Sequence, residues 1–139
     1  MKNLLYLPLA FLVISCYQSE RHCKDFKTGT FYSEVIIEDV LYKSLFTRSK
    51  EVQVETYNGK SDSAHVRWIN DCEMVFKTIH PKNMAEHKDI HLKILTTTDS
   101  SYIFEYSYVG DTKKQKGTAY KIKDQINLKD IKKILLHEN

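Results

Sequence analysis

The sequence predicts an all-β fold, an up-and-down antiparallel meander of about eight strands that forms a small barrel or half-barrel, followed by a short amphipathic helix. From residue 27 to residue 122, apolar and polar residues alternate with a period of two, as expected for strands with one buried face. Turn-forming pairs separate these segments, namely Asn58-Gly59, Asn70-Asp71 and Gly110-Asp111. About eight strands can close into a barrel without exposed edges, and a two-sheet sandwich is the alternative.

The chain begins with a segment typical of a bacterial export signal. Lys2 supplies a positive charge, residues 4–14 form an apolar run shorter than a membrane span, and Ser15 is a small residue at the cleavage point. Cys16 follows at once, and the run resembles the lipobox of bacterial lipoproteins. This resemblance implies a signal peptide over residues 1–15 and a diacylglyceryl group on Cys16, with acyl chains such as palmitate that anchor the protein. An ordinary secretory signal and a single-pass anchor are the alternatives.

A polar tether is expected over residues 16–26 and the barrel domain over residues 27–123. The expected strands cover residues 31–37, 40–48, 51–57, 65–69, 72–79, 90–96, 102–109 and 117–122. In the sixth segment we expect Ile90, Leu92, Ile94 and Thr96 to share one face. A polar, proline-containing loop over residues 80–88 is the longest break in the pattern.

Residues 124–139 have a different periodicity. Four apolar residues recur at helical spacing behind Asn127, which is a suitable N-cap. They are Leu128, Ile131, Ile134 and Leu135. We therefore expect a short amphipathic C-terminal helix that packs on the sheet.

Composition restricts the function classes. The chain is 42% apolar and 28% charged, with only four glycines and two prolines, so a disordered tail is excluded. The net charge is only +3, whereas proteins that bind nucleic acid carry clusters of Lys and Arg and a larger positive charge. We therefore expect no nucleic-acid partner.

The chain contains three cysteines, and one of them, Cys16, is the predicted lipidation site. If lipid occupies Cys16, an even number remains, Cys23 and Cys72, in a compartment where disulfides persist. We predict a structural disulfide between them. A metal site would need two further ligands, and a nucleophilic thiol would need a neighbouring base.

Three local patterns coincide behind the lipobox: Cys23-Lys-Asp-Phe-Lys-Thr-Gly-Thr-Phe31, then Arg48 with Gln53-Val-Glu55, then Trp68-Ile-Asn-Asp-Cys-Glu73. Over residues 16–123 they resemble a family of small lipoproteins from the Bacteroidetes, chiefly flavobacteria. The resemblance implies a lipocalin-like β-barrel with no assigned activity. Similar chains are often labelled DNA topoisomerase IV, but this chain has an export signal, lacks a nucleotide-binding loop and is too short for a cleavage–religation core.

One face of the expected strand 102–109 carries four aromatic side chains. They are Tyr102, Phe104, Tyr106 and Tyr108. Facing inward, they would line a cavity for a small apolar ligand, and we include Trp68 as a further candidate for that cavity. The alternatives are that the rings simply fill the barrel, or that they face outward as a partner-binding patch.

Metal and catalytic patterns are weak. His87 and His91 share a face only in a helix, whereas the alternation places His91 in a strand and His87 in the preceding loop, so we predict no metal site and no cofactor. No Ser-His-Asp order with an elbow glycine and no recognisable carboxylate pair occurs, so we predict that the protein is not an enzyme.

The sequence therefore predicts a lipid-anchored β-barrel module of the cell envelope that binds a small apolar ligand or an envelope protein. A structural lipoprotein that contacts proteins or peptidoglycan without a small ligand is the first alternative, and an enzyme that uses the barrel mouth is a remote one. Tyr17 does not resemble the aspartate that retains some lipoproteins in the inner membrane. The predicted location is the outer membrane.

Overall fold

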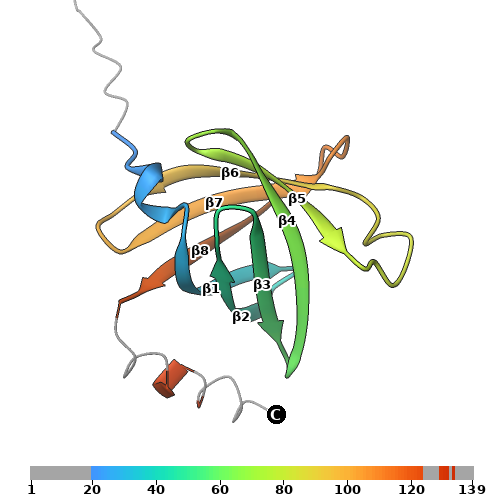
Figure 1. Ribbon diagram of the computed structural model, residues 1–139, viewed down its shortest axis with the longest axis horizontal. Helices are drawn as coiled ribbons and strands as arrows, with labels where there is room; N and C mark the ends of the chain where they lie inside the picture. The colour runs from blue at the N-terminus through green and yellow to red at the C-terminus, as the bar shows by residue number, and fades with distance from the viewer. Residues whose placement is uncertain (1–19, 124–128, 132, 134–139) are drawn as a thin grey trace, which may run out of the picture.

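The computed structural model describes residues 20–123, 129–131 and 133, and its eight strands form one closed antiparallel barrel (Figure 1). A 3-10 helix, η1, precedes them at Cys23–Phe26. The strands are β1 Gly29–Ile37, β2 Val40–Arg48, β3 Val52–Tyr57, β4 Lys60–Asn70, β5 Glu73–Ile79, β6 Ile90–Thr97, β7 Ser101–Tyr108 and β8 Gln115–Ile122. Consecutive strands are neighbours and β8 pairs with β1, which confirms the predicted all-β meander as a closed barrel. The half-barrel and sandwich alternatives are wrong.

The barrel has two different ends. We call the end where β1 begins the closed end; it carries η1 and the turns at residues 49–51, 71–72 and 98–100 (Figure 1). The opposite end is the open end, and it carries the turns at 38–39 and 58–59 and the longer connections at 80–89 and 109–114.

The closed end is densely packed around the aromatic side chains of η1, β1 and β2. Phe26 and Phe31 are 1% and 0% exposed, and Phe31 stacks on Phe46 with ring centroids 4.9 Å apart. Met74 and Ile94 are also fully buried beside them. A short helix therefore closes this end as a plug, because its one large apolar residue fills the remaining space between the strands.

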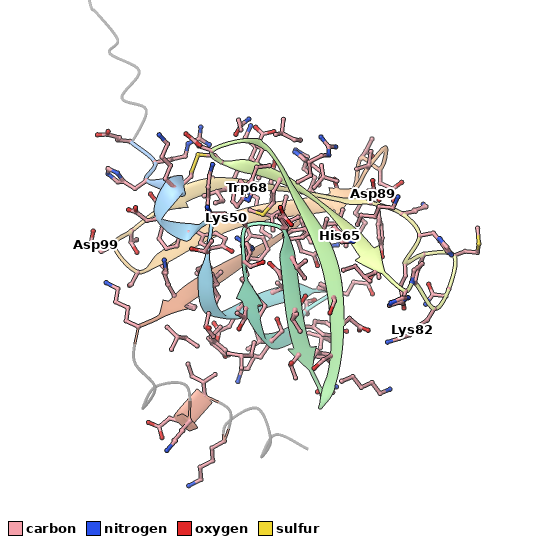
Figure 2. The ribbon with its side chains drawn as sticks, in the orientation of Figure 1. Lys50, His65, Trp68, Lys82, Asp89 and Asp99 are labelled. Atoms are coloured by element: carbon pink, nitrogen blue, oxygen red, sulfur yellow. A yellow bond between two sulfur atoms is a disulfide. The ribbon has the colours of Figure 1, made fainter. Side chains whose placement is uncertain are left out.

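A disulfide joins Cys23 to Cys72 with an S–S distance of 2.02 Å, as the sequence predicts (Figure 2). It ties η1 to the turn between β4 and β5. Lys27 strengthens the same junction through an ion pair of 2.8 Å with Asp71. The plug is therefore held covalently and electrostatically at the closed end.

β4 differs from the prediction in extent, and β6 differs in facing. β4 begins at Lys60, five residues before the predicted start, because it continues directly from the two-residue turn at Asn58 and Gly59, whose φ angles are 47° and 71°. In β6 a register shift between Ile94 and Thr96 places Thr96 opposite Ile103 on the outer face. The prediction that Thr96 shares the face of Ile94 is wrong, because a bulge breaks the alternation there.

Gly117 of β8 permits a close approach inside the barrel. A Cβ atom at this position would lie 2.7 Å from both Phe104 Cζ and Val35 Cγ2, and 2.8 Å from the carbonyl oxygen of Glu34. Since the carbonyl belongs to the paired strand β1, it cannot move away easily. β8 can therefore pack this tightly only with a glycine here.

Several predicted features lie outside the described residues: the signal peptide 1–15, Cys16, the tether up to residue 19, and residues 124–128, 132 and 134–139 of the C-terminal segment. Residues 129–131 and 133 are helical. Within the described part of the chain, the structure contains no helix with the length and hydrophobicity needed to cross a membrane.

Candidate functional site

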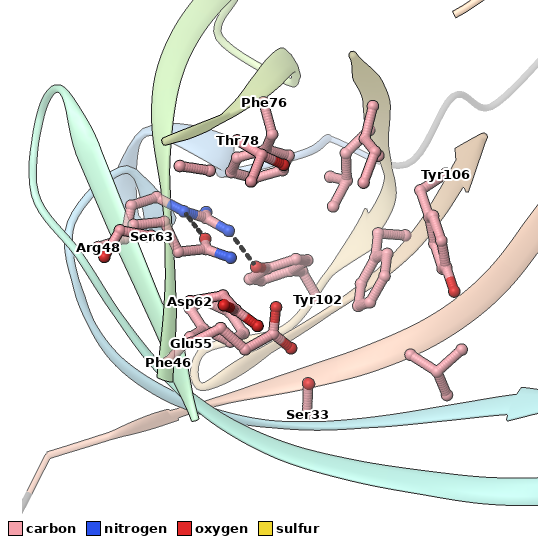
Figure 3. Close-up of a pocket in the computed structure, with 16 residues that line it drawn as sticks. Ser33, Phe46, Arg48, Glu55, Asp62, Ser63, Phe76, Thr78, Tyr102 and Tyr106 are labelled. Atoms are coloured by element: carbon pink, nitrogen blue, oxygen red, sulfur yellow. Dashed lines mark hydrogen bonds between the residues drawn. The ribbon is translucent and has the colours of Figure 1, made fainter. Parts of the chain in front are cut away.

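The interior of the barrel is not filled toward its open end. A cavity of about 250 Å³ lies there, lined by side chains from β1 to β7 (Figure 3). Six apolar residues form much of its wall: Val35, Phe46, Phe76, Ile90, Leu92 and Phe104. Apart from Ala64, the remaining lining residues carry polar groups, and one of them is a buried cation. An apolar chamber with a few placed polar groups is the usual character of a small-molecule site.

Arg48, the last residue of β2, forms the floor of the cavity and is 2% exposed. Its guanidinium donates hydrogen bonds to Gln53 Oε1 at 2.8 Å, to the carbonyl oxygen of Phe26 at 3.2 Å and to Tyr102 Oη at 3.1 Å. The bond to Phe26 caps a backbone carbonyl of η1. The arginine thus links η1, β3 and β7.

The guanidinium of Arg48 is surrounded by aromatic rings. Its Cζ lies 5.0 Å from the ring centroid of Phe46, 5.6 Å from that of Phe76 and 5.9 Å from that of Trp68. No carboxylate of a described residue forms an ion pair with it. Cation–π attraction and neutral acceptors therefore stabilise this buried charge.

Tyr102 lies beside Arg48 and is 1% exposed. Burial raises the pKa of its phenol, and the charge and hydrogen bond of Arg48 only partly oppose this effect. The hydroxyl therefore keeps its proton at neutral pH. Its oxygen accepts from Arg48, and no described residue accepts the hydroxyl hydrogen in return.

Two carboxylates lie on the wall nearer the mouth, on directly opposed positions of β3 and β4 (Figure 3). Glu55 accepts a hydrogen bond from Ser44, whose Oγ is 2.8 Å from that of Ser33. Asp62 is 60% exposed and pairs with Lys82 of the connection between β5 and β6. Without an imidazole among the lining residues, the Glu55–Ser44–Ser33 series lacks the nucleophile–base arrangement of a serine hydrolase.

Three of the five predicted ligand-binding residues line the cavity: Tyr102, Phe104 and Tyr106. Burial, and next the negative charge of Glu55, raise the pKa of Tyr106. Tyr108 is 38% exposed at the end of β7 and lies outside the lining; the ammonium group of Lys88 sits 5.6 Å from its ring centroid. The expectation that Tyr108 forms part of the inner wall is wrong, because the strand ends there at the rim.

Trp68 lies near the closed end of the barrel (Figure 2) and is not among the residues that line the cavity. Its ring packs against the core, 5.9 Å from Arg48 and 5.0 Å from the ammonium group of Lys27.

Several lining residues were not singled out from the sequence, among them Ser63, Ala64 and Thr78. For Ala64, the signal that could have indicated an inward-facing position is the turn at Asn58-Gly59. A two-residue hairpin fixes the register of β3 and β4, so Gln53 on the same face as Glu55 implies that its partner Ala64 faces inward as well.

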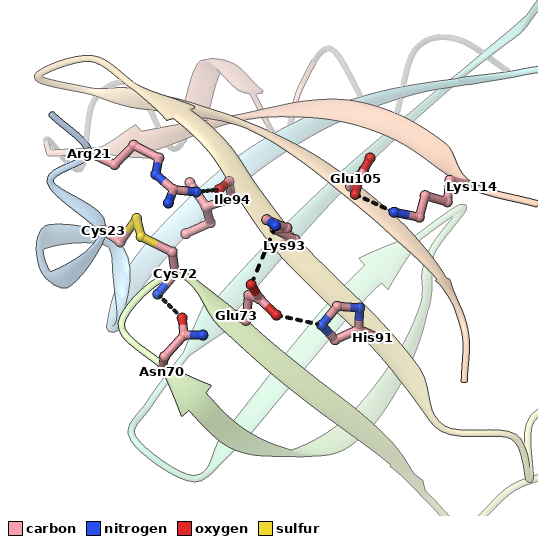
Figure 4. Close-up of polar contacts among 10 residues, drawn as sticks. All are labelled: Arg21, Cys23, Asn70, Cys72, Glu73, His91, Lys93, Ile94, Glu105 and Lys114. Atoms are coloured by element: carbon pink, nitrogen blue, oxygen red, sulfur yellow. Dashed lines mark hydrogen bonds and ion pairs between the residues drawn. A yellow bond between two sulfur atoms is a disulfide. The ribbon is translucent and has the colours of Figure 1, made fainter. Parts of the chain in front are cut away.

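On the outer wall, Glu73 joins β5 to β6 through His91 at 3.2 Å and Lys93 at 3.6 Å (Figure 4). Burial acts to raise the pKa of this carboxyl, but the bond to His91 and the charge of Lys93 outweigh it and hold the pKa below its ordinary value. Among the described residues no group of three or more His, Cys, Asp and Glu side chains is placed to hold a metal ion. His91 therefore lies in an ion-pair network, and the structure does not bring it together with His87.

No known protein family matches this chain, and no curated protein matches its sequence.

Proposed function

We propose that the protein is a lipid-anchored binding protein of the cell envelope that holds one small, largely apolar ligand inside its barrel. The observation that carries the proposal is the cavity of about 250 Å³ at the open end. An apolar cavity of about 150 Å³ takes up benzene, and pockets for drug-sized molecules begin at about 300 Å³. The volume therefore suits a ligand of about ten non-hydrogen atoms.

The position of the proposed anchor supports this function. Cys16 precedes Cys23 by seven residues, and a chain of that length spans at most about 25 Å. Cys23 is fixed to the closed end by the disulfide. A lipid on Cys16 therefore holds the closed end toward the membrane, and the mouth of the cavity faces away from it, where a ligand in the aqueous phase can enter.

Isothermal titration calorimetry of the purified protein tests the proposal. The probes are hexanoate, hexanamide, hexanol and hexylammonium, which have similar apolar chains and different head groups. We expect at least one probe to bind with a stoichiometry of one. Thr78→Trp, which places an indole in the cavity, should abolish that binding.

Lys77→Trp is the matched control, because Lys77 is the exposed neighbour of Thr78 on the outer face of β5. It should bind the same probes as the unaltered protein. If none of the four probes binds, or if Thr78→Trp binds as well as Lys77→Trp does, the proposal is wrong.

Binding of an envelope protein is the second candidate, and a specific surface favours it. The β1–β2 hairpin at the open end exposes Ile36, Val40 and Leu41 to 62%, 52% and 49%. Ile36 and Leu41 are directly opposed on β1 and β2, and exposed apolar side chains that lie together commonly mark an interaction surface. Ile36→Glu with Leu41→Glu should then remove cross-links to envelope proteins in cells and leave probe binding unchanged; unchanged cross-linking would exclude this surface.

A further inference from the structure

We infer that the ligand is a small organic acid whose carboxylate lies at the floor of the cavity, against Arg48 and Tyr102. This inference rests on the proposed function and adds the chemical class and the orientation of the ligand. It is carried by the unused hydrogen-bond donors at the floor and by the absence of a carboxylate partner for the buried guanidinium among the described residues.

The floor offers donors rather than acceptors. A guanidinium has five N–H groups, and Arg48 uses three of them on Gln53, Phe26 and Tyr102. Two N–H groups are left without an acceptor among the described residues, and so is the hydroxyl hydrogen of Tyr102. Arg48 and Tyr102 both line the cavity, so an acceptor group that reaches the floor meets donors from two side chains.

The charge at the floor distinguishes a carboxylate from a neutral acceptor. Arg48 is 2% exposed, so solvent and salt screen its charge poorly. Its contacts are with aromatic rings and neutral oxygens, which leaves a net positive charge in an apolar surrounding. A carboxylate supplies the missing counter-charge and accepts from a guanidinium in charge-assisted hydrogen bonds, which are about twice as strong as neutral ones.

The negative charges of Glu55 and Asp62 repel a ligand carboxylate, but both side chains lie closer to solvent than Arg48 does. Asp62 is 60% exposed and is neutralised by Lys82. Glu55 is exposed as well and is hydrogen-bonded to Ser44. Because solvent screens both charges, we expect them to repel an anion at the mouth less than Arg48 attracts it at the floor. They also disfavour the reverse orientation, in which the carboxylate would lie beside them.

The apolar part of the ligand then lies above the floor. Phe76, Leu92 and Phe104 form the wall there and are 8%, 7% and 6% exposed. These surfaces hold a short alkyl chain or a single ring. The arrangement therefore suits a short-chain fatty acid or a small aromatic acid, bound head first.

The same calorimetric titration tests the inference through the head groups. We expect hexanoate to bind about tenfold more tightly than hexanamide, a difference of about 1.4 kcal/mol, since only the carboxylate supplies a counter-charge to the buried guanidinium. Hexylammonium should bind most weakly. If hexanamide, hexanol or hexylammonium binds as tightly as hexanoate and Thr78→Trp abolishes that binding, this inference is overturned while the proposed function stands. If no probe binds, both fail.

Tyr102→Phe tests the hydrogen-bond donors at the floor independently of the cavity's apolar wall, because it removes only the hydroxyl and keeps the buried ring. It should weaken hexanoate binding about fivefold, as expected for the loss of one hydrogen bond. Tyr108→Phe is the control on the same strand and lies outside the cavity lining, so hexanoate binding should be unchanged. Near-ultraviolet circular dichroism establishes that both variants are folded. Equal hexanoate affinities of two folded variants would overturn the placement of the carboxylate at Tyr102.

Discussion

The two ends of this barrel are built from the same eight strands but differ in how their interior is filled. At the closed end Phe31, Met74 and Ile94 have no exposed surface. At the open end the inner face carries Ser33, Thr78 and other small or polar residues around a cavity. Alternation therefore decides which residues face inward, whereas the size of those residues decides whether the interior is solid.

Barrel geometry explains why this choice is available. An eight-stranded barrel is just wide enough for side chains to fill it or for one small ligand to be enclosed. At the closed end, stacked aromatic rings and η1 fill that space, and the disulfide holds η1 in place. Serine, alanine and threonine side chains leave it empty at the other end. The closed end therefore supplies rigidity, and the open end supplies the binding volume.

The largest expected effect comes from the same truncation made at each end of β6. Ile94→Ala should lower the free energy of unfolding by about 4 kcal/mol, because Ile94 is 0% exposed in the packed half. Ile90→Ala should cost about 1 kcal/mol, since Ile90 is half-buried and already borders a cavity. Urea denaturation of both variants measures the difference, and equal losses would contradict the distinction between the two halves.

The disulfide is the next largest contribution to the closed end. A bridge between residues 49 apart stabilises by about 4 kcal/mol in the chain-entropy model. Cys23→Ala with Cys72→Ala should therefore lose about 3–4 kcal/mol in urea denaturation. Reduction of the unaltered protein is the control and should cause a similar loss. A loss below about 1 kcal/mol in both cases would mean that packing alone holds the plug.

Replacing one alanine with leucine in each half of the barrel distinguishes the two halves most directly. Ala119 is 0% exposed in the packed core, whereas Ala64 lines the cavity. Ala119→Leu should destabilise by about 2 kcal/mol through overpacking, whereas Ala64→Leu should be neutral or stabilise by up to about 1 kcal/mol. Thermal unfolding measures both.

Ala64→Leu should also weaken probe binding, because it occupies part of the cavity. An Ala64→Leu variant that is destabilised as much as Ala119→Leu would mean that the open half is as tightly packed as the closed half.

The sequence predicted the strands and their order well, because period-two patterns and turn pairs are local signals. The facing of β3 illustrates where such signals fail. Val54 points outward and is 41% exposed, whereas Gln53 and Glu55 point into the cavity. An inner face that borders a cavity need not be apolar, so hydrophobic alternation does not identify it. The early start of β4 was missed for the same reason, since Asp62 and Ala64 line this cavity.

The site was only partly predictable. Tyr102, Phe104 and Tyr106 lie on the cavity wall, as the alternation along 102–109 suggested, but the role of Tyr108 depends on where the strand ends. The residues at the floor of the cavity could not be predicted together, because they meet only through contacts between segments that are distant in the sequence. Arg48 meets Phe26, which is 22 residues away, and Tyr102, which is 54 residues away. Only the closed barrel places Arg48 beside an empty volume.

The smallest expected effect concerns charges on the outer wall, where carboxyl groups with a lowered pKa lie toward both ends of the barrel. At the closed end, the hydrogen bond from Lys27 lowers the pKa of Asp71. Toward the open end, the hydrogen bond from Lys114 at 2.6 Å lowers the pKa of Glu105. Since each folded-state pKa lies below the unfolded value, the stabilisation is present at neutral pH and is lost as the pH falls through the carboxyl range.

Glu105→Gln should therefore lower the free energy of unfolding by about 0.5 kcal/mol near neutral pH and by almost nothing at about pH 3. Lys114→Met removes the partner and should produce the same pH dependence, and the double variant should lose no more than either single one because all three changes break one pair. Urea denaturation at both pH values measures these differences. Because Glu105 lies on the outer face of β7, hexanoate affinity should stay constant in all three variants. A change in that affinity would mean that the outer wall and the cavity are coupled through β7.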